Sequence, residues 1–125
     1  MATPNAASQH YTDGKSVDVR LSATVESHDV VYAEGWLGIA ATGGDSDDYI
    51  ALLVDEREYI FDVGSNLPVN KGDIVYVDPT LLEGNQPALA GYTTTAGGSV
   101  IPLFKATTAK RVDNTVRGIL IVGEA

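Results

Sequence analysis

Short apolar runs separated by turn residues are the feature of this chain that most restricts its fold. Val17, Val19 and Leu21 alternate with the polar residues Asp18 and Arg20, which is the period of a half-buried β-strand. Similar runs recur at intervals of about 8 to 12 residues, and no segment has an apolar stripe of helical period and length. We therefore expect an all-β fold, a small compact β-barrel or sandwich of about seven to eight short strands. The other expected strands cover residues 30–32, 36–40, 49–54, 59–62, 74–77, 100–105 and 116–122.

A four-residue phrase occurs twice in this pattern. Asp-Val-Val-Tyr at residues 29–32 is matched by Asp-Ile-Val-Tyr at residues 73–76. An Asp side chain can accept hydrogen bonds from nearby backbone amides in a turn, and β-branched residues suit a pleated surface. We interpret the two phrases as equivalent turn-to-strand transitions, with chance similarity as the alternative. Gly38, inside an expected strand, predicts a bulge or a close backbone approach.

Residues 1–15 are small, polar and without periodicity. They are expected to form a flexible N-terminal arm, followed by a single β domain at residues 16–125. The arm is either a tail without a role or a segment that becomes ordered on a partner. It lacks the basic and apolar regions of a signal peptide, and no run approaches the roughly 18 apolar residues of a membrane span. We expect a protein made in the cytoplasm, with no membrane partner.

The chain is strongly acidic, with a net charge of -9 from 17 acidic and 8 basic residues. Such a surface repels phosphate backbones, so we expect no nucleic-acid partner. The acidity serves either solubility alone or docking onto a basic surface. The chain contains no Cys, which excludes a disulfide framework and a Cys-based zinc site.

Two sequence motifs resemble a catalytic site and a metal-binding site. Ser27, His28 and Asp29 are the residue types of a hydrolase triad, but consecutive residues of an extended chain point to alternate sides, so a turn is expected. The acidic segment 45–48 resembles the start of a calcium loop, yet Ile50 stands where that loop requires Gly. We interpret it as a solvated loop, with a weak cation site as the alternative. No catalytic, cofactor-binding or metal-binding residues are predicted.

The aromatic residues are candidates for protein contacts. Trp36 is the single Trp of the chain, and in an all-β domain we expect it in the core rather than on a contact surface. Tyr11, next to the arm, and Tyr92, beside Gly91, are expected to be exposed. Exposed aromatic residues of this kind anchor protein interfaces.

The order of these phrases resembles that of the capsid cement or head decoration proteins of tailed phages. Residues 72–78, Gly-Asp-Ile-Val-Tyr-Val-Asp, carry the best match, and the resemblance spans about residues 16–122. Two features depart from the family pattern: His28 stands where its first Gly is usual, and its late Gly-x-Ala phrase is not evident near residues 102–106. The remaining phrases that carry the resemblance lie at residues 29–31, 37–40, 59–61 and 117–121.

The resemblance implies a structural protein of the virion, without catalytic residues. Such proteins bind the exterior of the expanded head and bridge subunits of the major capsid protein, and many act as homotrimers. Alternatives are a tail or spike component, a non-viral oligomeric β-barrel binding module, and a small trimeric β enzyme acting on nucleotides. On the cement-protein hypothesis, the arm lies on the capsid. Its candidate contact residues are Ala2, Thr3, Pro4, Asn5, Ala6, Ala7, Ser8, Gln9, His10 and Tyr11.

Overall fold

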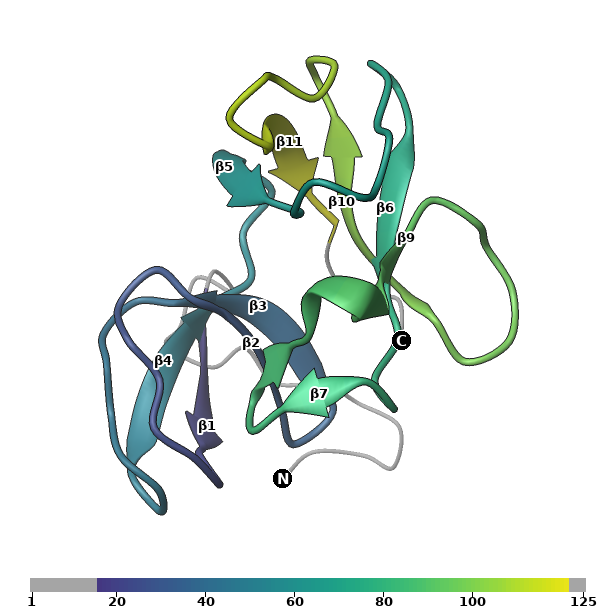
Figure 1. Ribbon diagram of the computed structural model, residues 1–125. Coiled ribbons are helices and arrows are strands. Elements are labelled where there is room, and N and C mark those ends of the chain that lie inside the picture. Colours follow the sequence, from purple (N-terminus) through teal and green to yellow (C-terminus); the bar gives the residue numbers. More distant parts are fainter. Residues whose placement is uncertain (1–15, 122–125) are drawn as a thin grey trace, which may run out of the picture.

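The computed structural model describes residues 16–121 and contains eight strands of four to six residues (Figure 1). Three two-residue strands and one short 3-10 helix, η1, complete the regular structure. The expected arm at residues 1–15 and the last four residues of the expected domain lie outside the described residues. The longer strands are β1 Ser16–Arg20, β2 Val30–Ala33, β3 Trp36–Ala40, β4 Tyr49–Leu53, β5 Glu58–Asp62, β6 Ile74–Val77, β10 Ile101–Ala106 and β11 Thr115–Leu120. The short elements are β7 Leu82–Glu83, β8 Gln86–Pro87, η1 Leu89–Gly91 and β9 Tyr92–Thr93.

The strands form two main antiparallel sheets and one short hairpin. The first sheet has the order β1-β4-β3-β2, the second β5-β11-β10-β6-β9, and β7 pairs with β8. Neither order returns to its first strand within residues 16–121, so backbone pairing closes no barrel there. The all-β prediction is confirmed at the level of antiparallel sheets. In Figure 1 the first sheet lies below and the second above, with β7 and the short helix η1 beside them.

One core lies against the inner face of the first sheet. Val19 on β1, Val31 on β2 and Leu52 on β4 are fully buried there, because alternate residues of each strand face the same side. Val25 joins them through an isolated bridge to Gly44. The other buried members of this first core are Leu21, Ala33, Ala40, Ile50 and Val54.

A second core lies under the five-stranded sheet and reaches the back of the first sheet. The rings of Phe61 on β5 and Phe104 on β10 stack with their centroids 4.0 Å apart. Ile39 of β3 belongs to this core, and Leu53 of β4 packs against it. Strand β4 therefore contributes to both cores, Leu52 to one and Leu53 to the other. This explains the nearly continuous apolar run at residues 49–54.

A bulge in β10 determines which of its side chains reach the outer face. The pairing with β6 shifts between Pro102 and Phe104, leaving Leu103 as the extra residue. Leu103 and Phe104 are both buried, whereas Lys105 is exposed on the opposite face. The predicted close approach at Gly38 is confirmed, because a Cβ there would overlap the backbone carbonyl oxygen of Leu53. Within residues 16–121, no helix is long and apolar enough to cross a membrane.

Candidate functional site

The two repeated phrases begin in the same turn. An Oδ2 of Asp29 accepts a hydrogen bond from the backbone N–H of Glu26 at 2.8 Å, and Asp73 accepts one from Asn70 at 2.8 Å. In each turn the Asp N–H also donates back to the carbonyl oxygen three residues earlier. The preceding residue is left-handed in both, with φ of 73° at His28 and 92° at Gly72. The prediction of two equivalent turn-to-strand transitions is confirmed.

The acidic segment is a third copy of this turn, which the sequence analysis missed. Asp48 accepts a hydrogen bond from the N–H of Asp45 at 2.9 Å, and Asp47 is left-handed with φ of 74°. The signal that could have revealed it is an Asp placed directly before the strand that begins at Tyr49. Asp47 pairs with Arg20 at 2.9 Å. Among residues 16–121 no cluster of three or more His, Asp or Glu side chains could hold a metal ion.

The triad-like segment is also part of a turn, as predicted. Ser27 Oγ lies 3.4 Å from His28 Nδ1 and donates to the carbonyl oxygen of Ala41 at 3.3 Å. The Asp29 carboxylate instead accepts hydrogen bonds from the Glu26 N–H and from Gln86 Nε2, at 2.8 and 2.9 Å. It therefore stabilises the turn and the neighbouring β8 strand.

A buried Asn that the sequence analysis missed joins the β7–β8 hairpin to the first sheet. Asn85 is the one buried polar residue in the described part of the chain. Its Oδ1 accepts hydrogen bonds from the N–H groups of Ser22 and Ala23 at 2.8 and 3.0 Å, and its Nδ2 donates to Tyr32 O at 3.2 Å. Pairing with Ser22, 63 residues away, leaves no local sequence signal.

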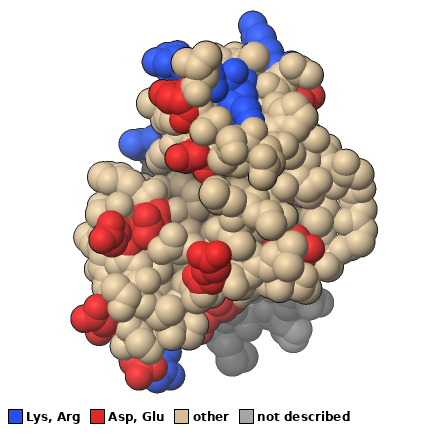
Figure 2. Space-filling view, viewed as in Figure 1, with Lys and Arg blue, Asp and Glu red and all other residues tan. Residues whose placement is uncertain are grey.

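Charge is divided unevenly between the two halves of the described chain. Residues 16–56 contain nine acidic residues and a single basic residue, Arg20, whereas residues 57–121 contain six of each. Figure 2 shows Lys and Arg concentrated over the upper part of the molecule, where the five-stranded sheet lies, and mostly Asp and Glu below. Negative charge is therefore concentrated over the first sheet, and basic side chains are concentrated over the second.

The outer face of the five-stranded sheet carries exposed apolar side chains that the sequence pattern did not predict. Ile60 on β5 is 65% exposed and Ile119 on β11 is 43% exposed. In the strand register Arg117 stands opposite Ile60, and Lys105 opposite Ile119. A solvated face of an antiparallel sheet is ordinarily polar. Ile60 and Ile119 therefore make this face more apolar than an ordinary solvated sheet face.

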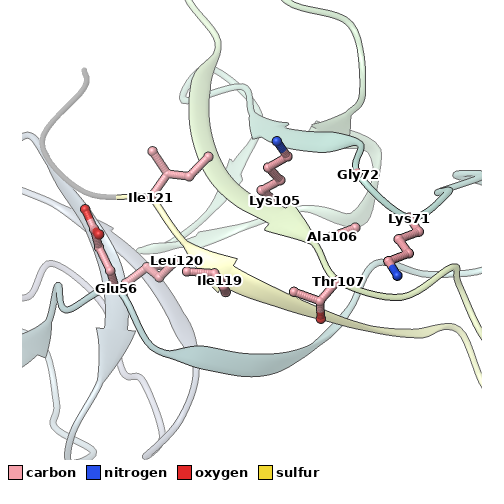
Figure 3. A pocket seen from close by; sticks show the side chains of 9 residues that line it. All are labelled: Glu56, Lys71, Gly72, Lys105, Ala106, Thr107, Ile119, Leu120 and Ile121. Atoms are coloured by element: carbon pink, nitrogen blue, oxygen red, sulfur yellow. The ribbon is translucent and has the colours of Figure 1, made fainter.

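This face continues into an open recess of about 480 Å³. Figure 3 shows Ile119 and Ile121 in the recess, Lys105 and Lys71 on one side and Glu56 at the far end. The lining is apolar in its middle and carries the charged residues around it. The remaining lining residues are Gly72, Ala106, Thr107 and Leu120.

Two of the aromatic predictions are wrong. Trp36 is 40% exposed rather than buried, because it stands at the hairpin end of β3, opposite Ala33, where the sheet stops. Tyr92 is partly buried rather than exposed, because it lies in strand β9, which pairs with β6. Burial, followed by the nearby carboxylates of Asp62 and Asp29, raises the pKa of Tyr92 to about 12. Tyr49 is 69% exposed, although the sequence did not indicate it as a surface aromatic residue.

The candidate arm contacts at residues 2–11, Tyr11 among them, lie outside the described residues. No protein-family model matches the chain, and neither the curated proteins nor the solved structures contain a match to it.

Proposed function

We propose that this chain is a structural virion protein that binds the exterior of an expanded phage capsid and stabilises it by bridging subunits of the major capsid protein. On this proposal it acts by binding alone, without catalysis. One observation carries the proposal: each sequence phrase behind the resemblance to head decoration proteins coincides, to within one residue, with a strand or with a strand and the turn that begins it. The best match, residues 72–78, comprises a turn, strand β6 and the residue that follows it.

The main departure from the family pattern supports the same assignment. His28 occupies the place of the usual Gly, and it adopts φ of 73°, in the left-handed region that Gly favours. Its turn has the same hydrogen bonds as the Gly72 turn. The substitution therefore preserves the backbone geometry on which the pattern depends.

We infer that the first half of the chain forms a small barrel-like shell. Its strands do not pair all the way round, and side chains bridge the gap between β2 and β1. Strand β8 lies beside β2, where the N–H of Tyr32 donates to Asn85 O at 2.7 Å. From there Asn85 Oδ1 reaches the residues that follow β1, at the other edge of the sheet. The Glu34 carboxylate also accepts a hydrogen bond from the N–H of Arg20, at 2.6 Å. These contacts support closure of the sheet from β2 back to β1.

The acidic surface of residues 16–56 supports docking on a basic region of the capsid. Complementary charge guides association and selects partners more than it adds affinity. A homotrimer, which the resemblance implies, would place three such surfaces on one site. Modest individual contacts then give firm attachment, because later contacts are effectively intramolecular.

A titration of purified protein into expanded heads tests the proposal. We expect saturation at a fixed ratio to the major capsid protein and an affinity that falls as salt is raised. Unexpanded heads provide the control for recognition of the mature surface. Absence of saturable binding would contradict the proposal, and electron microscopy of labelled particles with label on the tail would favour the tail or spike alternative.

A further inference from the structure

The recess beside the β10 and β11 strands has the composition of a binding site for an acidic, apolar group. Lys71 and Lys105 stand on one side of an apolar floor that includes Ile119 and Ile121. Glu56 lies at the far end, and the nearby Glu58 carboxylate accepts a hydrogen bond from Thr107 Oγ1 at 2.7 Å. The part nearest the two lysines is therefore cationic and apolar at once.

A complementary group projects from the acidic half of the same chain. Glu34 and Gly35 both have positive φ, 50° and 82°, which is the two-residue turn that matches the twist of a β-hairpin. This turn holds Trp36 at the end of the sheet with 40% of its surface exposed. The Glu34 carboxylate is fixed by its hydrogen bond from the N–H of Arg20. We call these two side chains, Glu34 and Trp36, the hairpin corner.

We propose that the recess of one molecule receives the hairpin corner of a second copy. The indole of Trp36 would cover the apolar floor, and Glu34 would lie toward Lys71 and Lys105. Exposed Trp residues in preformed positions are frequent anchors of protein interfaces. The corner belongs to a half with one basic residue, so its surroundings also favour the cationic side of the recess.

The arrangement of the two surfaces determines the form of the assembly. The corner and the recess belong to different sheets, so the contact is heterologous: each molecule offers one of each. Such contacts build a ring when the rotation between neighbours closes, and an open chain when it does not. The inference does not depend on capsid binding, because both surfaces belong to this chain.

The single Trp makes the contact directly observable. Sedimentation equilibrium and Trp emission should be recorded over one concentration series of the full chain. We expect the mass to rise and the emission to move to shorter wavelength over the same range, because association removes Trp36 from water. Lys105→Glu should weaken association at least about tenfold and displace both curves together, because it places like charges opposite each other.

Three further variants separate the contact from general effects of charge and folding. Arg111→Glu makes the same charge change on an exposed residue outside the recess and should behave as the wild type. Glu34→Gln keeps an acceptor for the Arg20 N–H but removes the charge, so it should weaken association and reduce its salt dependence. Trp36→Ala should abolish the rise in mass. Retained native circular dichroism would show that each variant is folded.

Three results would overturn the inference: a chain that remains monomeric to about 1 mM, a rise in mass without a change in emission, or association that Lys105→Glu leaves intact. If Lys105→Glu leaves self-association intact but abolishes head binding, the recess would be assigned to the capsid. Because self-association is measured without heads, failure of the capsid proposal would leave this result interpretable.

Discussion

Tyr32 and Asn85 exchange two hydrogen bonds across the junction of the β2 strand and the β7–β8 hairpin. The N–H of Tyr32 donates to the backbone oxygen of Asn85 at 2.7 Å, and Asn85 Nδ2 donates to the backbone oxygen of Tyr32 at 3.2 Å. The same side chain accepts from Ser22 and Ala23 beyond the end of β1. One buried amide thus satisfies backbone groups at both edges of the first sheet.

Asn85→Ala is expected to destabilise the fold by roughly 1–3 kcal/mol, because it leaves the partly buried N–H groups of Ser22 and Ala23 without their acceptor. Urea unfolding followed by circular dichroism measures the change in free energy. Asn66→Ala, at an exposed Asn, provides the control and should stay within about 0.5 kcal/mol of the wild type. Equal stability of the two variants would show that the Asn85 hydrogen bonds contribute little.

Substitutions of the left-handed residue in the two repeated turns should change the free energy of unfolding in opposite directions. Gly72→Ala should cost about 1 kcal/mol, because an L side chain is strained at φ of 92°. His28→Gly should gain roughly 0.5 kcal/mol, because relief of strain at φ of 73° exceeds the added freedom of the unfolded chain. Thermal and urea unfolding measure both. A loss of stability in His28→Gly would contradict the inferred strain at His28.

The strands could be predicted because alternation and turn residues are local properties. The alternation from Val17 to Arg20 and the run from Ile74 to Val77 reveal their inward faces within a few residues, and both lie in strands where expected. The third turn was also local, but its three Asp residues were interpreted as a solvated loop, with a weak cation site as the alternative. The hydrogen bond from the Asp45 N–H to Asp48 identifies it as the same turn as those at Asp29 and Asp73.

The surfaces could not be predicted, because they depend on pairing between distant segments. Ile119 is exposed beside Lys105 because the bulge at Leu103 sets which β10 residues face outward. Trp36 is exposed because the sheet ends at its hairpin, although composition favoured a core position. The residue types at Ile119 and Trp36 reveal neither the bulge nor the end of the sheet that leaves these side chains exposed.

Gly118→Ala is expected to be among the most damaging single changes in the second core. A Cβ at Gly118 would overlap the ring of Phe104, which is fully buried and stacks on Phe61, so the ring has little room to move. Overpacking of this kind costs roughly 1–3 kcal/mol or more. Denaturant unfolding measures the loss. The double variant Gly118→Ala with Phe104→Leu should recover part of it, and no recovery would contradict the proposed overlap.

Two tyrosines should make the protein sensitive to alkali. Burial, aided by the hydrogen bond to Asp55, raises the pKa of Tyr59 to about 12, and burial does the same for Tyr92. The unfolded chain loses these protons near its ordinary pKa of 10.0. The stabilisation is therefore fully present below pH 10 and is lost as the pH rises toward about 12.

Tyr92→Phe tests this pH dependence, because it keeps the aromatic ring and removes the ionisable hydroxyl group. Its free energy of unfolding should fall less steeply above pH 10 than that of the wild type, by roughly 2 kcal/mol in total. Urea unfolding at closely spaced pH values between 8 and about 12 measures the difference. Parallel curves for the two proteins would contradict the raised pKa of Tyr92.

Deletion of residues 2–14 tests the part of the capsid proposal that depends on the N-terminal arm. These residues are small and polar, so contact with the capsid would fix them at a cost of about 1–2 kcal/mol per residue that binding must exceed. If they lie on the capsid, the deletion should reduce occupancy of expanded heads while unfolding of the β domain is unchanged. A Gly/Ser segment of the same length should not restore binding, because it has the length of the arm but lacks the side chains that would contact the capsid. Unchanged occupancy in the deletion variant would assign capsid binding to the β domain alone.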